Sequence, residues 1–189
     1  IDYRWDFVPP ASSAGGHHPD DKNGEQIKDI WAIAAALNEG VEKATVKFGV
    51  AARKWQTQVS FEGKGSTSIG QGDYAFYFAK PYVEDDHTYL TVSDNMLDFP
   101  HRVIAIDING NIHESVDTSS GTAGEIRQST FGFKNLPMEN IQEFKFQTRR
   151  YEWVEFKNVS LRAGVESDVE VGVVGKTDDK AAGGEGFGE

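Results

Sequence analysis

Residues 44–61, ATVKFGVAARKWQTQVSF, contain two runs in which apolar and polar side chains alternate. The first run, residues 44–50, places an apolar side chain at every second position, and residues 55–61 repeat this period. Successive side chains of a β-strand point to opposite faces. The pattern therefore predicts two strands, each with one buried and one solvent-exposed face. We therefore expect a mainly β protein.

Further strands are predicted on the C-terminal side of this stretch. Asn109-Gly110 lies between two apolar runs and is a strong signal for a β-hairpin. Residues 74–79 are apolar on both faces, which predicts a central strand. The other expected strands are 89–92, 103–108, 124–133, 141–148, 151–161 and 165–174. Short strands in close succession, without helices between them, predict an antiparallel β-sandwich or jelly-roll-like fold.

One N-terminal helix is expected over residues 25–38. Apolar residues recur there at three- and four-residue steps, at Ile27, Ile30, Trp31, Ala34 and Leu37. Asn23 is a suitable N-cap, and Gly40 would end the helix. The predicted organisation is an N-terminal strand and loop over 1–24, a single sandwich domain over 25–175 that includes helix 25–38, and a flexible acidic Gly-rich tail over 176–189.

Residues 151–161 contain a change of face. The apolar side chains of Val154 and Phe156 share one face of the strand, and after them the alternation of apolar and polar residues shifts by one position. This shift predicts a β-bulge near Lys157-Asn158. Phe146 and Phe156 are expected on the buried faces of adjacent strands. The side chain of Trp153 points to the opposite face of the strand from Val154 and Phe156, and we expect it to pack beneath the predicted helix.

Composition excludes several classes of function. The 189 residues carry 19 basic and 30 acidic side chains, a net charge of −11, which opposes binding to a phosphate backbone. Cysteine is absent, so disulfides and thiolate chemistry are excluded. No apolar run is long enough to span a bilayer, so we expect no membrane insertion by this segment.

Two polar clusters contain groups that can bind metals. His17-His18-Pro19-Asp20-Asp21 and Glu84-Asp85-Asp86-His87 both lack the spacing of a zinc or calcium site. We interpret the first as a solvated loop and the second as a turn between strands. No catalytic residue, metal site or cofactor is predicted.

The residues most suited to bind a ligand are Arg149, Tyr151, Trp153 and Glu155. Aromatic rings at alternate positions of one strand, flanked by charged groups, can stack on sugar rings and bind their hydroxyls. Glu152 and Glu155, beside Trp153, are the carboxylate pair that a glycosidase would need.

Residues 136–161 carry a family resemblance. The sequence LPMENIQEFKFQTRRYEWVEFKNVSL resembles a conserved IxEFxFQTRPYEWVEFRNVSL block in uncharacterised bacterial proteins. Those proteins include planctomycete-type chains fused to sensor metallopeptidases or to extracytoplasmic-function sigma factors. Arg150 stands where the family often has Pro. The resemblance also extends to residues 46–52 and 102–107, and it implies a signalling accessory domain.

The sequence thus favours a non-catalytic sensing or protein-interaction domain of a larger bacterial signalling protein. The alternatives are a carbohydrate-binding module and a glycosidase-like β-sandwich. The expected partners are other domains of the parent protein or a signalling partner, with a glycan as a further candidate and no nucleic acid. An extracytoplasmic, periplasmic location is favoured.

Overall fold

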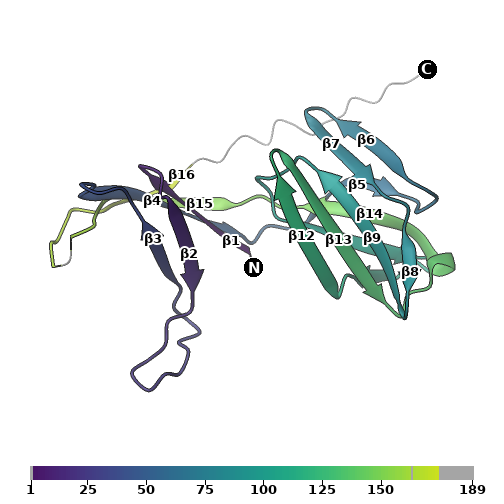
Figure 1. The fold of residues 1–189 in the computed structure, drawn as a ribbon, viewed down its shortest axis with the longest axis horizontal. Coiled ribbons are helices and arrows are strands. Elements are labelled where there is room, and N and C mark those ends of the chain that lie inside the picture. Colours follow the sequence, from purple (N-terminus) through teal and green to yellow (C-terminus); the bar gives the residue numbers. More distant parts are fainter. Residues whose placement is uncertain (1, 163, 175–189) are drawn as a thin grey trace. The chain divides into compact units, whose positions relative to one another are not determined.

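The computed structural model describes residues 2–162 and 164–174, apart from the side chain of Asp117 (Figure 1). Within these residues the protein consists mainly of antiparallel sheets, as predicted, but it is all-β: it has no α-helix, only a 3-10 turn, η1 (Met138–Asn140). None of the described residues forms a helix long and apolar enough to cross a membrane. The predicted tail, 176–189, lies outside the described residues.

The chain divides into two compact units. Unit 1 consists of the described residues of Ile1–Val50 and Glu152–Glu189, and unit 2 is Ala51–Tyr151. Each unit has its own sheets and is considered by itself below.

Unit 2 contains a four-stranded sheet with the order β11-β10-β14-β5. Its strands are β5 (Gln56–Phe61), β10 (His101–Asp107), β11 (Ile112–Glu114) and β14 (Ile141–Thr148). Strands β10 and β11 form the hairpin predicted at Asn109-Gly110. Asp107 N donates to Asn111 O at 3.0 Å, so the loop has three residues, and Gly110 at its end has the positive φ (83°) that such a loop requires.

The second sheet of unit 2 has six strands, in the order β12-β13-β9-β7-β6, with β8 also paired to β9 (Figure 1). Their bounds are β6 (Thr67–Gln71), β7 (Tyr74–Phe78), β8 (Tyr82–Glu84), β9 (His87–Asp94), β12 (Asp117–Ala123) and β13 (Ile126–Lys134). Burial alternates strictly along β9, where every second residue from Thr88 to Asp94 is buried. One face of this sheet therefore belongs to the core.

The core of unit 2 is formed by aromatic side chains from both sheets. Ring pairs join the two sheets with centroid separations of 5.1 Å for Phe61 and Phe78, 5.1 Å for Phe76 and Phe146, and 5.5 Å for Phe133 and Phe144. Leu90, Val92 and Val103 fill the space beside them. Burial of these large rings is the main apolar contribution to the stability of unit 2.

Strand β7 lies inside the sheet, between β9 and β6, as the prediction of a central strand requires. Its two faces differ, however, because only Phe76 and Phe78 are buried, while Tyr77 is 47% exposed. Aromatic residues suit a half-exposed strand as well as a buried one, so apolar content alone did not separate the two cases.

Asp107 closes the β10–β11 hairpin. Its carboxylate accepts hydrogen bonds from the backbone N–H groups of Asn109 and Asn111 and from Asn111 Nδ2, each at 2.9 Å. His113 Nε2 lies 3.0 Å from Oδ2. The bonds from Asn111 and His113 hold the pKa of Asp107 well below its ordinary value.

Unit 1 contains a four-stranded sheet in the order β1-β4-β15-β16 and a separate hairpin, β2-β3. The strands are β1 (Asp2–Val8), β2 (Ser13–His17), β3 (Ala32–Ala36), β4 (Lys43–Ala51), β15 (Glu152–Ser160) and β16 (Glu170–Val174). The predicted β-bulge is confirmed, because the β15–β4 register shifts between Phe156 and Val159, and Asn158 has φ 58°.

The predicted helix over 25–38 is wrong. Residues 32–36 form β3 and pair with β2, and the segment before them is a loop closed by an Asp20–Gln26 bridge. Asn23, the expected N-cap of the helix, lies in this loop. Asp21 Oδ1 accepts hydrogen bonds from the backbone N–H groups of Asn23 and Glu25, both at 2.8 Å.

Tertiary packing explains this outcome. Trp31 packs against the backbone of Gly16 on β2, where an added Cβ would lie 2.4 Å from Trp31 Nε1. The Trp31 ring also lies 5.4 Å from that of Tyr3 on β1. A helix of about 13 residues is marginal alone, so strand pairing and ring packing outweigh its apolar spacing.

Two further expectations at β15 change with this result. Trp153 cannot pack beneath a helix that does not form; instead its ring covers Gly49 of β4, where an added Cβ would lie 3.0 Å from three ring atoms. Phe156 is not on a strand adjacent to that of Phe146, because β15 and β14 belong to different sheets. Phe146 is fully buried, whereas Phe156 is half-buried.

We predict that Phe146→Ala lowers the free energy of unfolding by about 3–5 kcal/mol, because it removes a ring with 0% exposure and leaves a cavity. Chemical denaturation measures the change. Ser60→Ala, at an exposed position of β5, serves as the control and should stay within about 0.5 kcal/mol. An equally small effect of Phe146→Ala would contradict the packing of the two sheets.

We also predict that Asp107 stabilises the fold in a pH-dependent way. A carboxyl group whose pKa is lowered on folding stabilises the protein above its unfolded value, 3.8, and loses that effect as the pH falls through the folded value. Denaturation of the wild type and of Asp107→Asn between about pH 5 and pH 2 tests this. The stability difference should be largest at pH 5 and shrink towards pH 2; a constant difference would refute the role of the charge.

Candidate functional site

The outer side of the six-stranded sheet carries a continuous group of uncharged side chains. Because directly paired residues share a face, the register defines the rows of this surface. One row crosses five strands through Ser68, Tyr77, Ser93, Gln128 and Gly121. A second joins Thr91, Thr130 and Ser119, and a third joins Tyr82, Tyr89 and Gly132. We call the side chains of Tyr77, Tyr82, Tyr89, Thr91, Ser93, Gln128 and Thr130 the neutral face.

The neutral face stands out by its lack of charge. Charged residues make up 26% of the chain, yet the first two rows contain none, and the third reaches one only at the edge strand β12, where Gly132 pairs with Asp117. The row of Glu84, His87 and Lys134, at the end of the sheet, also carries charge. A surface rich in Tyr, Ser and Thr offers large rings and adaptable hydrogen-bonding groups, the composition that many recognition surfaces use.

Three tyrosines supply the rings of this face. Tyr77 and Tyr82 are 47% and 48% exposed, and Tyr89 is partly exposed. Tyr82 stacks on Tyr89 with ring centroids 5.3 Å apart, and His87 stacks on the same ring at 5.7 Å. These contacts hold Tyr82 and Tyr89 in place, so that they form a prepared aromatic surface.

Hydroxyl and amide groups lie between the tyrosines. Thr91 Oγ1 and Thr130 Oγ1 are 2.8 Å apart, and Gln128 Nε2 donates to Ser93 Oγ at 3.3 Å. A hydroxyl group has one donor and two acceptor positions, so each of these pairs keeps capacity for a further hydrogen bond. The face can therefore bind a ligand that carries many neutral donors and acceptors.

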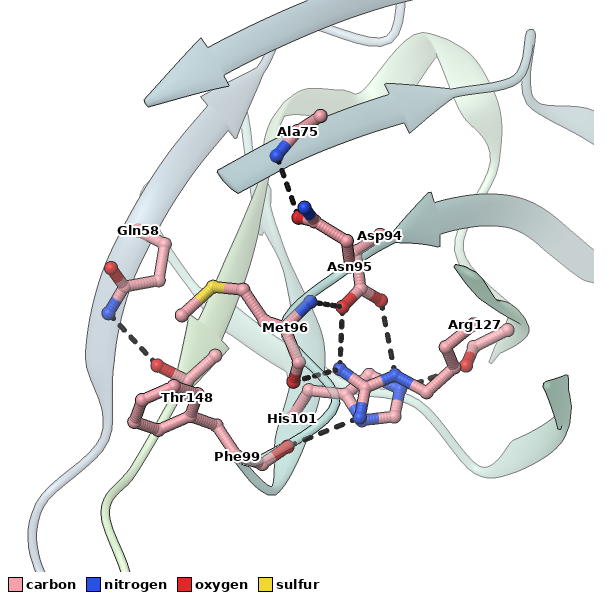
Figure 2. Close-up of polar contacts among 10 residues, drawn as sticks. Gln58, Ala75, Asp94, Asn95, Met96, Phe99, His101, Arg127 and Thr148 are labelled. Carbon is pink, nitrogen blue, oxygen red and sulfur yellow. Dashed lines mark hydrogen bonds and ion pairs between the residues drawn. The ribbon is translucent and has the colours of Figure 1, made fainter. Parts of the chain in front are cut away.

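A buried ion pair lies beneath the neutral face, on the core side of the same strands (Figure 2). Arg127 donates from Nε to Asp94 Oδ2 at 3.1 Å and from Nη2 to Oδ1 at 2.7 Å. It also donates to the carbonyl oxygens of Met96 and Phe99, both at 3.2 Å. The guanidinium group thus ties β13 to β9 and to the loop that follows β9.

The four residues predicted from sequence are distributed over both units. In unit 2, the Arg149 guanidinium lies 4.3 Å from the centroid of the Trp55 ring, and Tyr151 is half-buried. In unit 1, Trp153 covers Gly49, and Glu155 forms ion pairs with Lys47 at 3.9 Å and with Lys157 at 3.3 Å. Whether these residues bind a ligand stays a prediction.

The two polar clusters have structural partners. Residues 84–87 form the turn of the β8–β9 hairpin, as predicted, and His87 Nδ1 lies 2.6 Å from Asp86 Oδ1. This turn and residues 135–139 line a cavity of about 450 Å³. His18 Nδ1 is 2.8 Å from the carbonyl oxygen of Ile30. Among the residues that the structure describes, no three His, Asp or Glu side chains are grouped to hold a metal ion.

Sequence reasoning missed the neutral face. Its signal was present in β9, where Tyr89, Thr91 and Ser93 alternate with Leu90 and Val92. The polar positions of this alternation carry no charged residue, unlike the polar positions of residues 44–50. The neighbouring strands that extend the face could be found only from the register of the sheet.

We predict that Asp94→Ala destabilises the protein by about 3–5 kcal/mol, because it leaves the Arg127 guanidinium charged and uncompensated in the core. Equilibrium denaturation gives the value. Glu125→Ala, in the exposed turn between β12 and β13, is the matched carboxylate control and should change stability by less than about 0.5 kcal/mol. Equal effects of both substitutions would show that the buried pair does not stabilise the sheet.

Comparison with known proteins adds no relative: no protein-family model, no curated protein and no solved structure matches this chain.

Proposed function

We propose that this chain is a non-catalytic binding domain that serves sensing or interaction in a larger bacterial signalling protein, with the neutral face as its recognition surface. In this proposal unit 2 is a β-sandwich of the jelly-roll-like type, and it carries the face on its six-stranded sheet. The paired strands of this sheet hold the binding groups in position before a ligand arrives, which reduces the entropy cost of binding.

The observation that carries the proposal is the lack of charge on the neutral face. An outer sheet face that only has to stay soluble usually carries charged side chains, as the side of β14 away from the core does with Glu143 and Lys145. Here three exposed or partly exposed tyrosines lie among hydroxyl and amide groups instead. Exposed aromatic side chains at such a density are typical of binding surfaces.

The buried ionisable groups of unit 2 support a structural role for its interior. Asp94 is engaged by Arg127, and Asp107 by Asn109, Asn111 and His113. Each of these carboxylates stabilises a strand pair or a turn. The resemblance of residues 136–161 to accessory segments of signalling proteins supports the proposed setting, an extracytoplasmic sensing domain.

A binding screen with the full chain tests the proposal. The immobilised protein is offered neutral polysaccharides, acidic polysaccharides and a peptide library. Thr91→Arg places a long cation in the middle of the neutral face, and Ser60→Arg makes the same change at an exposed position of the other sheet. We expect one ligand class to bind, with at least a tenfold loss for Thr91→Arg and no change for Ser60→Arg.

Thermal denaturation of both variants shows whether each is folded. Absence of binding by all three ligand classes at millimolar concentration would overturn the proposal. Binding that Thr91→Arg leaves unchanged would overturn it as well, because the ligand would then use another surface.

A further inference from the structure

We infer that the ligand of the neutral face is a linear, neutral polysaccharide that lies along β9. This inference rests on the proposed function and adds the chemical class and the direction of the ligand. It follows from the spacing of the rings, from the groups between them and from the pairing of the backbone.

The rings mark two ends of a line that follows β9. Tyr82 and Tyr89 form one end, and Tyr77, which is paired with Ser93, forms the other. Tyr89 and Ser93 are four residues apart on the strand, which corresponds to about 13 Å at 3.3 Å per residue. A single sugar ring is shorter than this distance, whereas several linked sugar rings reach both ends.

Hydrogen-bonding groups fill the interval between the rings. Thr91 lies midway on β9 with Thr130 beside it, and Ser93 and Gln128 lie next to Tyr77. A sugar hydroxyl both donates and accepts, as do the side chains of Thr and Ser. Rings that stack on apolar sugar faces, separated by hydroxyl and amide groups, match a chain of pyranose units in both respects.

Charge and backbone pairing argue against other ligands. The chain carries a net charge of −11, so an anionic polysaccharide would be repelled, and the face offers no cation within its three rows. An extended peptide commonly adds a strand to a sheet edge, where backbone groups are free. The neutral face is centred on β9, which pairs with β13 on one side and with β7 and β8 on the other. Side chains are therefore what this surface presents, and that favours a ligand rich in hydroxyl groups.

Isothermal titration calorimetry with defined oligosaccharides tests the inference. The probes are gluco-, xylo- and manno-oligosaccharides from one to six units, and polygalacturonate is the anionic comparison. For one neutral series we expect Kd to fall at least tenfold from the disaccharide to the hexasaccharide. Polygalacturonate should not bind.

Two tyrosine variants locate the ligand. Tyr77→Ala should weaken hexasaccharide binding about tenfold, because it removes one end of the line. Tyr74→Ala is the matched control. Tyr74 is also an exposed tyrosine of β7, but it lies on the same face of the strand as the buried residues Phe76 and Phe78. It should leave Kd unchanged.

The outcomes separate the inference from the proposed function. If a peptide binds and Thr91→Arg abolishes this binding, or if an anionic polymer binds and Thr91→Arg changes its Kd at least tenfold, the neutral face is a recognition surface and the inference is wrong. If a monosaccharide binds as tightly as a hexasaccharide, or if Tyr77→Ala has no effect, the extended mode along β9 is wrong. If no ligand of any class binds, the inference and the proposed function both fail.

Discussion

The arrangement of unit 2 depends on which side of β9 and β13 faces the core. Asp94 and Arg127 are directly paired across these strands and form a buried ion pair, and the carbonyl oxygens of Met96 and Phe99 accept two further N–H groups of the guanidinium. A shift of either strand by one residue would expose this pair and turn polar side chains inward. The ion pair, drawn in Figure 2, and the aromatic core therefore select one register of β9 and β13.

The same register creates the neutral face. With Leu90, Val92 and Asp94 on the core side, Tyr89, Thr91 and Ser93 have to face outward. On β13 the burial of Ser129 and Phe131 places Gln128 and Thr130 outside, next to their partners on β9. The aromatic core and the neutral face are thus two sides of one sheet, and the register that packs the core also fixes the order of the side chains on the face.

Unit 1 shows how packing can outweigh a local pattern. The apolar residues of 25–38 recur at helical spacing, yet residues 32–36 pair with residues 13–17. Trp31 uses the space left by the missing side chain of Gly16 and contacts Tyr3 from β1. Helical spacing is a necessary condition for an amphipathic helix. Here, however, a glycine-rich partner strand and an aromatic neighbour stabilise the β2–β3 hairpin more than helical spacing stabilises a helix.

The sequence by itself determined that the protein is mainly β with antiparallel strands, and it determined the Asn109-Gly110 hairpin and the bulge before Val159, because each depends on residues close together in the chain. It could not determine the fate of residues 25–38, the separate sheets of β14 and β15, or the exposed side of β7. For the candidate site, alternation in β9 was readable, but its extension to Tyr77, Gln128 and Thr130 was not. Only the tertiary structure decided these features, because strand partners and register arise from contacts between residues far apart in the chain, and local periodicity contains no information about them.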